Sequence, residues 1–224
     1  MDGDALLAEQ KRYYRERASE YDDWWFRRGR YALEPGAAAR WFDDCAEVER
    51  ALEEFRPRGD VLELACGTGL WTRRLVRHAE CLTAIDASAE MIALNRHRIV
   101  GAAVEYIQAD IFGWRPDRAF DACFFGFWLS HVPEERFDEF WRLVRAALAP
   151  GGRVFLVDSG RGDGAHTTVL RGGEELRRLA DGREFRIVKR YDEPRALERR
   201  LAGLGFELDA RTTANGSLLY ASGA

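Results

Sequence analysis

The sequence predicts an α/β fold in which most strands of a seven-stranded sheet run parallel. Between Asp60 and Asp158, short apolar runs alternate with helical patterns, which implies parallel strands joined by right-handed crossovers. Two further apolar runs flank Asn215 and Gly216, a pair typical of a tight hairpin. The chain has 224 residues, 46% of them hydrophobic, which suffices for one domain with a cap or an insertion.

Two helices are expected before the first strand. Apolar and aromatic residues recur at helical spacing over residues 4–21, and an aromatic, arginine-rich connector follows over residues 22–30. A second helical pattern covers residues 37–56. We expect these elements to form an N-terminal helical cap, residues 1–58.

The expected core covers residues 59–158. Its strands are expected at residues 61–65, 81–85, 104–107, 120–125 and 153–157. Its helices are expected at residues 70–78, 88–98 and 133–148, with Ser88 as the N-cap of the second. In such a sheet the carboxyl ends of the parallel strands form the edge at which ligands bind.

The alternation stops after Asp158, and a lid over residues 159–192 is expected to follow strand five. Its elements are a glycine-rich segment, a short helix and a strand, at residues 160–173, 174–180 and 184–191. A closing helix and an antiparallel hairpin are expected within residues 193–224, at residues 194–204, 206–212 and 217–221. We expect cap, core, lid and closing segment to form one domain, residues 1–224.

The composition argues against several function classes. A net charge of −4 gives no basic bias toward nucleic acid or an anionic membrane, so neither is expected as a partner. The four cysteines lie far apart without a CxxC pair, and we expect no metal site and no disulfide framework. No apolar stretch approaches the roughly 20 residues of a membrane span, and the N-terminus lacks a signal-peptide pattern. We therefore expect a cytoplasmic protein.

The charge is unevenly distributed along the chain. Residues 160–190 carry a net charge of +3, which leaves −7 on the rest. Lys11 and Lys189 are the only lysines beside 32 arginines, and Lys189 falls in the cationic lid. Arginine and lysine bind carboxylates and phosphates well, so this lid suits a small anionic substrate. The alternative is a solvated charged face.

A glycine-rich turn carries the chemistry of the core. Gly67 and Gly69 stand where the first strand becomes a helix, so a ligand can approach the backbone closely. A nicotinamide or flavin enzyme would need a third small residue at Thr72. Glu63 at the strand end would repel a pyrophosphate but suits a cationic ligand.

Four landmarks follow the order typical of one enzyme family. After the Glu63–Gly69 turn come Asp86 at the end of the second strand, Asp110 after the third, and the turn at residues 148–152. This pattern resembles that of the class I S-adenosylmethionine-dependent methyltransferases. The resemblance implies a Rossmann-like sheet, S-adenosylmethionine as cofactor and S-adenosylhomocysteine as product. It places Asp86 at the ribose hydroxyls and Asp110 at the adenine amino group.

The expected cofactor-binding residues are these landmarks with their neighbours, together with two tyrosines, Tyr13 and Tyr21, that the narrower resemblance described below implies. They are Tyr13, Tyr21, Glu63, Ala65, Gly67, Thr68, Gly69, Trp71, Asp86, Ala87, Met91, Asp110 and Ile111. Some have alternative roles: Glu63 as a partner of the helix dipole, Asp110 as the cap of a turn, and Met91 as a core residue.

The methyl acceptor is expected to be a small molecule. The segment after the fourth strand lacks the Asn/Asp-Pro-Pro-aromatic motif of amino methyltransferases, and the chain has no Pro-Cys pair of cytosine C5 enzymes. His131 in this segment is the candidate catalytic residue, because a neutral imidazole can accept a proton or orient an acidic oxygen. Its alternative role is that of a capping or core histidine.

A narrower resemblance extends from about residue 10 to the C-terminus. Residues 13–22, 128–133 and 181–189 resemble the phosphonate O-methyltransferases of the dehydrophos type. The resemblance implies His131 at the reacting oxygen, Arg177 and Lys189 as ligands of the anion, and Tyr13 and Tyr21 over the methionine end of the donor. Trp25 and Trp128 are further expected to contact the acceptor. The connector departs from the family, so a bulkier acid would also fit.

We therefore expect an O-methyltransferase of secondary metabolism that acts on a small anionic metabolite, a phosphonate or a carboxylate. One alternative is an N- or C-methyltransferase of a neutral metabolite such as a quinone precursor. A protein of another class, a catalytically silent ligand-binding relative, is a second alternative. A monomer or a homodimer is expected.

Overall fold

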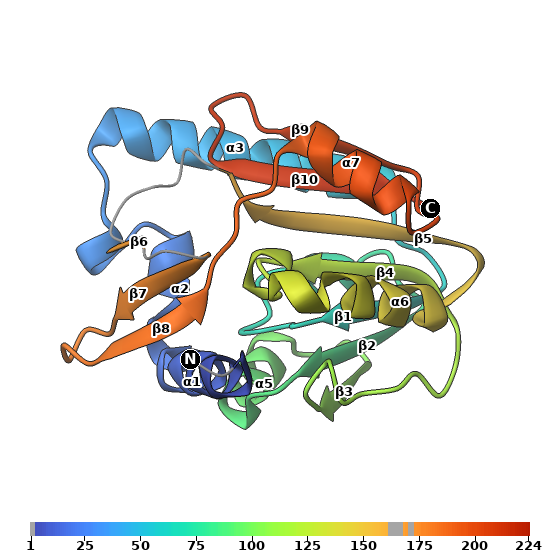
Figure 1. The fold of residues 1–224 in the computed structure, drawn as a ribbon, viewed down its shortest axis with the longest axis horizontal. Coiled ribbons are helices and arrows are strands. Elements are labelled where there is room, and N and C mark those ends of the chain that lie inside the picture. The colour runs from blue at the N-terminus through green and yellow to red at the C-terminus, as the bar shows by residue number, and fades with distance from the viewer. Residues whose placement is uncertain (1–2, 161–167, 170–172) are drawn as a thin grey trace.

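The computed structural model describes residues 3–160, 168–169 and 173–224 of the chain. Seven strands form one sheet in the order β3-β2-β1-β4-β5-β10-β9, in which β1 to β5 run parallel (Figure 1). These strands are β1 (Asp60–Leu64), β2 (Cys81–Asp86), β3 (Val104–Gln108), β4 (Phe120–Gly126), β5 (Leu148–Ser159), β9 (Leu208–Thr212) and β10 (Leu218–Gly223). The predicted α/β fold is confirmed.

Two apolar layers bury the faces of this sheet. Helices α6 (Phe137–Ala147) and α7 (Pro194–Ala202) cover one face through residues such as Trp141 and Leu201. Helix α3 (Pro35–Phe55) covers the other face, where Leu52 and Phe55 pack beside Trp71. Helix α5 (Ala89–Arg98) follows β2, and the Ser88 hydroxyl accepts from the Met91 amide, so the predicted N-cap is confirmed.

Some predicted boundaries differ from the structure. The expected helix over residues 70–78 is reduced to α4 (Thr72–Leu75), and β5 begins at Leu148 instead of residue 153. The expected helix over residues 4–21 ends early as α1 (Gly3–Glu16). Three short elements then follow: η1 (Ala18–Glu20), α2 (Tyr21–Trp25) and η2 (Gly29–Tyr31).

The lid forms a second, antiparallel sheet of β6 (Thr168–Val169), β7 (Glu174–Arg178) and β8 (Glu184–Val188). The helix expected near residues 174–180 was therefore wrong. Helix-forming residues there gave a helical pattern, but pairing with β8 across the turn at Asp181 and Gly182 overrides it. Most of the predicted glycine-rich segment lies outside the described residues.

The cap and the lid meet beside the carboxyl end of the parallel sheet. Helix α1 packs against β8 and reaches α5, as Figure 1 shows below the orange strands. Two 3-10 turns, η3 (Leu129–His131) and η4 (Glu134–Arg136), connect β4 to α6, and η3 contacts β8. No helix in the described part of the chain is long and apolar enough to cross a membrane.

The predicted hairpin at Asn215 and Gly216 is confirmed, since β9 and β10 pair antiparallel and Gly216 has a φ of +78°. A buried carboxylate ties this hairpin to α3. Asp44 accepts hydrogen bonds from the amides of Asn215 and Ser217, both at 3.0 Å, and from the Asn215 side chain at 2.9 Å. Asp44 thus fixes the closing hairpin against the cap.

We predict that Asp44→Ala lowers the free energy of unfolding by roughly 2–4 kcal/mol, because buried amides lose a charged acceptor. Burial alone would raise the pKa of Asp44, but hydrogen bonds from Ser217 and Asn215 lower it. The stabilisation is therefore present above the ordinary value of 3.8 and lost as the pH falls below it. Urea denaturation at pH 7 measures the effect. Exposed Asp43→Ala is the control, and equal stabilities of the two variants would contradict the prediction.

Candidate active site

A cavity of about 800 Å³ lies between α1 and the carboxyl ends of the parallel strands. Its walls come from α1, from the segments after β1, β2, β3 and β4, and from η3. The predicted site residues that line it are Tyr21, Ala65, Asp86, Ala87, Met91, Asp110, Ile111, Trp128 and His131. The structure thus brings together residues that are up to 110 positions apart in the chain.

Asp86 is held rigidly at the end of β2. Its Oδ2 accepts from the Gly67 amide and its Oδ1 from the Ser88 amide, both at 2.9 Å. Burial raises the pKa of Asp86, while these backbone hydrogen bonds oppose the rise. Each carboxylate oxygen keeps a further lone pair, so the residue can accept hydrogen bonds from hydroxyls of a ligand.

Glu63 supports the glycine-rich turn from behind. It is 1% exposed, does not line the cavity and accepts from the Thr72 hydroxyl at 2.7 Å. Burial, with a smaller contribution from Asp86, raises the pKa of Glu63 to about 8. The Asn95 side chain donates to Thr72 at 2.8 Å, and this network joins β1, α4 and α5.

The remaining residues of the turn also lie outside the cavity lining. A Cβ on Gly69 would come within 2.6 Å of the Asn95 side chain, so glycine permits the close approach of α5. The Thr68 hydroxyl donates to Asp22 at 2.6 Å, and Trp71 packs under Gly126. The part of the cavity wall formed by Ala65 and Asp86 is supported from outside by Gly67, Thr68, Gly69 and Trp71.

Asp110 has two partners in the protein. Its Oδ1 accepts from the Phe112 amide at 3.1 Å, which matches the alternative role as the cap of a turn. Its Oδ2 lies 2.5 Å from Lys11 Nζ on α1, in a half-exposed ion pair. Lys11 therefore links the cap to the part of the cavity where an adenine amino group was expected.

His131 is buried with a defined tautomer. Its Nδ1 lies 2.7 Å from the Val188 carbonyl, which only accepts, so Nδ1 carries the proton. Its Nε2 lies 2.6 Å from the Tyr14 hydroxyl, which therefore donates to it. Burial lowers the pKa of His131 well below its usual value, and the charges of Lys189 and Arg177 add to this effect. The imidazole is neutral at pH 7.

Gln10 completes the surroundings of His131. Its Nε2 donates to the His131 carbonyl at 3.1 Å, and its Oε1 accepts from the Val188 amide at 2.9 Å. Gln10, His131 and Val188 thus form a closed ring of hydrogen bonds that joins α1, η3 and β8.

Tyr14 lines the cavity, whereas Tyr13, which was expected there, does not. Tyr13 is 1% exposed and packs with Phe185 and Ile187 of the lid, away from the cavity lining. Neighbouring residues of a helix point about 100° apart, so only one of the two faces the cavity. Most of α1 between Ala5 and Arg15 lines the cavity, Gln10 and Tyr14 included, and sequence reasoning did not single out either of these two residues.

The two expected acceptor-binding tryptophans differ in position. Trp128 lines the cavity, whereas Trp25 is 3% exposed in an aromatic cluster outside its lining. Trp25 packs edge-to-face against Trp41, Trp71 and Phe127. Phe127, which precedes Trp128 in the chain, also lines the cavity and has a φ of +54°.

Lys189 does not line the cavity, and its ammonium group has polar partners in the protein. Its Nζ donates to the hydroxyls of Ser130 and Ser159, both at 2.9 Å, and lies 3.5 Å from Asp158. The ammonium group of Lys189 is thus balanced by a carboxylate within the site.

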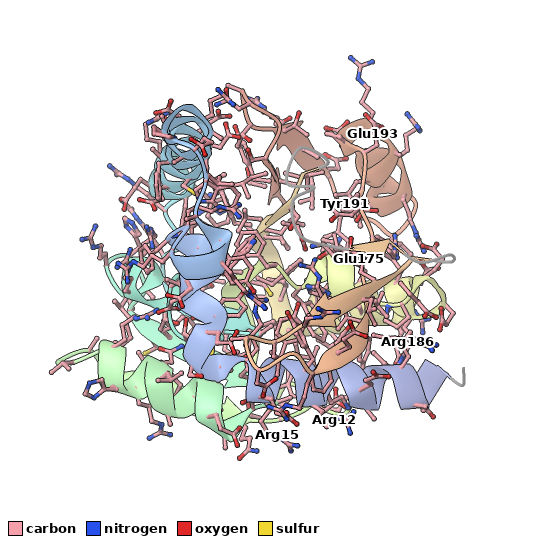
Figure 2. All side chains as sticks on the ribbon, turned by 90° about the vertical axis from the view of Figure 1, so that its left-hand side faces the viewer. Arg12, Arg15, Glu175, Arg186, Tyr191 and Glu193 are labelled. Carbon is pink, nitrogen blue, oxygen red and sulfur yellow. The ribbon has the colours of Figure 1, made fainter. Side chains whose placement is uncertain are left out.

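The charge of Arg177 is also balanced by a neighbouring carboxylate. Its guanidinium lies 2.6 Å from Glu175 of the same strand, and Glu175 also accepts from the Tyr191 hydroxyl at 3.0 Å. Figure 2 shows Glu175 on β7 and Tyr191 on the segment that follows β8. Arg177 Nε is buried without a hydrogen-bond partner, so this side chain retains an unused donor.

The donor set fits a nucleoside ligand. Asp86 and Asp110 supply carboxylate acceptors on one wall, and Met91, Ile111 and Phe112 supply apolar surface between them. Ribose hydroxyls and an exocyclic amino group need such acceptors, and an aromatic base needs such surface. Among the described residues, no group of three His, Cys, Asp or Glu side chains could hold a metal ion.

Comparisons with known proteins agree with this site. A family model described as a methyltransferase domain matches residues 61–152. A solved DhpI–SAM–HEP complex is 41% identical, with a TM-score of 0.81 and 99% of each chain covered. A DhpI–SAH complex is 43% identical, with a TM-score of 0.77, 97% of this chain and 95% of that chain covered.

The chain is also 29% identical to a ubiquinone biosynthesis O-methyltransferase of Xanthomonas axonopodis pv. citri (strain 306), over 77% of both chains. The near-complete match to the DhpI structures covers the cap, the core and the lid together. S-adenosylmethionine is accordingly the cofactor. The chain belongs to the class I S-adenosylmethionine-dependent methyltransferases.

Proposed function

We propose that this methyltransferase transfers the methyl group to an oxygen of a small anionic acceptor, a phosphonate or a carboxylate. The observation that carries the proposal is the neutral pair of Tyr14 and His131 on the cavity wall, with Lys189 and Arg177 close enough to lower the pKa of His131. Buried cations beside a site favour an anionic ligand, because charges interact strongly where water is excluded.

When bound, S-adenosylmethionine supplies an activated methyl group: the acceptor oxygen bonds to the methyl carbon as the bond to the sulfonium sulfur breaks, and S-adenosylhomocysteine leaves. The protein has to align the acceptor oxygen with this methyl group and exclude water. Helix α1, which packs against β8 of the lid, lines one side of the cavity, and Trp128 and Phe127 add apolar wall. An acceptor that is already anionic needs no base, so positioning suffices.

Tyr14 and His131 supply polar contacts for such an acceptor. Burial raises the pKa of Tyr14 well above its usual value, so its hydroxyl stays protonated. His131 Nε2 accepts from that hydroxyl and carries no proton, so it cannot donate to an anionic oxygen. The Tyr14 hydroxyl can donate to that oxygen once its proton turns away from His131, which places the reacting oxygen beside Tyr14 on the cavity wall.

A further clue to the acceptor comes from DhpI, whose complex contains HEP together with SAM. The second candidate function is methylation of a neutral quinone precursor, which the ubiquinone biosynthesis relative favours. For a neutral hydroxyl, His131 would act through Tyr14 as the base, and the cations of the lid would be dispensable.

A panel of acceptors tests the two candidates. Small phosphonates and carboxylates, phenols and amines are incubated with the enzyme and S-adenosylmethionine, and release of S-adenosylhomocysteine is measured. We expect turnover with the acids, and methyl esters as products. Turnover confined to phenols or amines would contradict the proposal.

We predict that Asp86→Asn weakens binding of S-adenosylhomocysteine roughly tenfold or more. In the variant an NH2 group replaces one carboxylate oxygen and cannot accept from the Gly67 or Ser88 amide. The remaining oxygen is uncharged and therefore a weaker acceptor for a ligand hydroxyl. Isothermal titration calorimetry measures the affinity. Asp117→Asn, an exposed control, should bind like the wild type, and an unchanged affinity of the Asp86 variant would exclude its cofactor role.

We predict that Arg177→Ala raises the KM for the acceptor roughly tenfold to a hundredfold and leaves binding of S-adenosylhomocysteine unchanged. The matched control is Arg178→Ala on the same strand. Arg178 is exposed and pairs with Glu184 at the surface. Equal acceptor KM values for the two variants would show that the charge of Arg177 plays no part.

We predict that Lys189→Met reduces acceptor turnover and retains donor affinity. The charge of Lys189 helps to lower the pKa of His131, so its removal raises that pKa. The acid limb of the rate profile should therefore move to higher pH, since His131 has to be neutral to accept from Tyr14. Unchanged turnover and an unchanged profile would rule out the role of Lys189.

A further inference from the structure

Arg17 is a buried cation that the roles above leave unexplained. It follows α1, is 5% exposed, and its Nε is buried without a hydrogen-bond partner. Within the described ranges, no carboxylate oxygen lies within 4.0 Å of its guanidinium. This distinguishes Arg17 from Lys189 and Arg177, which have Asp158 and Glu175 as partners.

The guanidinium of Arg17 is surrounded by aromatic rings. Its central carbon lies 5.6 Å from the ring centroid of Tyr13, 5.1 Å from that of Tyr21 and 5.6 Å from that of Tyr31. Cation–π attraction offsets part of the desolvation cost of a buried charge. Among the described residues, these rings therefore take the place of a carboxylate partner beside the guanidinium.

This charge lies next to the cavity. Tyr21 lines the cavity, and its ring centroid is 6.4 Å from that of Tyr14, which also lines it. Burial dominates the pKa shifts of Tyr14 and His131. The charge of Arg17 adds to the lowering at His131 and opposes the rise at Tyr14. Arg17 therefore acts electrostatically on the part of the cavity where the acceptor is proposed to bind.

We propose that Arg17 recognises an anionic group, a carboxylate or phosphonate, of a ligand bound against the wall formed by Tyr14 and Tyr21. The part of this proposal that concerns the acceptor rests on the proposed function, and the part that concerns the donor does not. The desolvation cost of this charge is already incurred in the free protein, so only the desolvation cost of the arriving anion opposes the attraction. Two ligands can supply the anion: the amino-acid end of the donor, and the acceptor.

Binding experiments with Arg17→Met separate these two sources. Methionine keeps much of the side-chain length and removes the charge. The probes are S-adenosylhomocysteine, 5′-methylthioadenosine, which has the same nucleoside without the amino acid, and methylphosphonate added to protein saturated with S-adenosylhomocysteine. Each is titrated into wild-type and variant protein by calorimetry.

We expect Arg17→Met to weaken one anionic probe roughly tenfold or more and to leave 5′-methylthioadenosine unchanged. Loss for S-adenosylhomocysteine assigns Arg17 to the donor carboxylate, and loss for methylphosphonate assigns it to the acceptor. Unchanged affinity for all three probes would overturn the proposal. If the wild type binds S-adenosylhomocysteine but not methylphosphonate, this phosphonate is contradicted as an acceptor, and the two donor probes alone decide the role of Arg17.

Thermal unfolding of the ligand-free protein distinguishes recognition from a structural role. Removing an uncompensated buried charge should leave the unfolding temperature of Arg17→Met equal to or above that of the wild type. Arg17→Lys, which keeps the charge, should retain most of the affinity. The control Arg28→Met removes an exposed arginine 4.7 Å from the Phe26 centroid and should alter neither property. A lower unfolding temperature for Arg17→Met with unchanged affinities would show that Arg17 only supports the fold.

Discussion

One ring of hydrogen bonds joins the three parts of the molecule that meet at the site. Gln10 on the cap donates to the His131 carbonyl and accepts from the Val188 amide, and the His131 ring donates to the Val188 carbonyl. Buried backbone groups need partners, so the cap, the core turn and the lid cannot separate here without leaving several of them unsatisfied. The hydrogen bond from His131 Nδ1 to the Val188 carbonyl sets the tautomer of His131, and Nε2 is therefore left as an acceptor.

The cavity has two walls of different origin, and helix α1 connects them. The donor wall comes from the turns after β1, β2 and β3, where Asp86 is held by two backbone amides. The acceptor wall, where we propose that the acceptor binds, comes from η3, which contacts β8 of the lid. Lys11 of α1 pairs with Asp110 on the donor side, and Tyr14 of the same helix donates to His131 on the other. One helix therefore contacts both walls.

The cations near the acceptor wall are balanced to different degrees. Lys189 lies beside Asp158 and Arg177 beside Glu175, so part of the field of each is cancelled before a ligand arrives. Arg17 has only tyrosine rings around it among the described residues. An anion in this part of the cavity would experience the field of all three, with Arg17 the least compensated.

The sequence by itself determined the parallel core, the hairpin at Asn215 and the position of Asp86 at the end of β2, because strand periodicity and turn chemistry are local. The tertiary structure decided what depends on long-range pairing. Residues 174–178 became a strand because β8 pairs with them, and Tyr14 rather than Tyr13 faces the cavity because helix α1 docks with that side inward. It also decided that Lys189 has a carboxylate partner, since Asp158 belongs to β5 and no local pattern encodes its distance from Lys189.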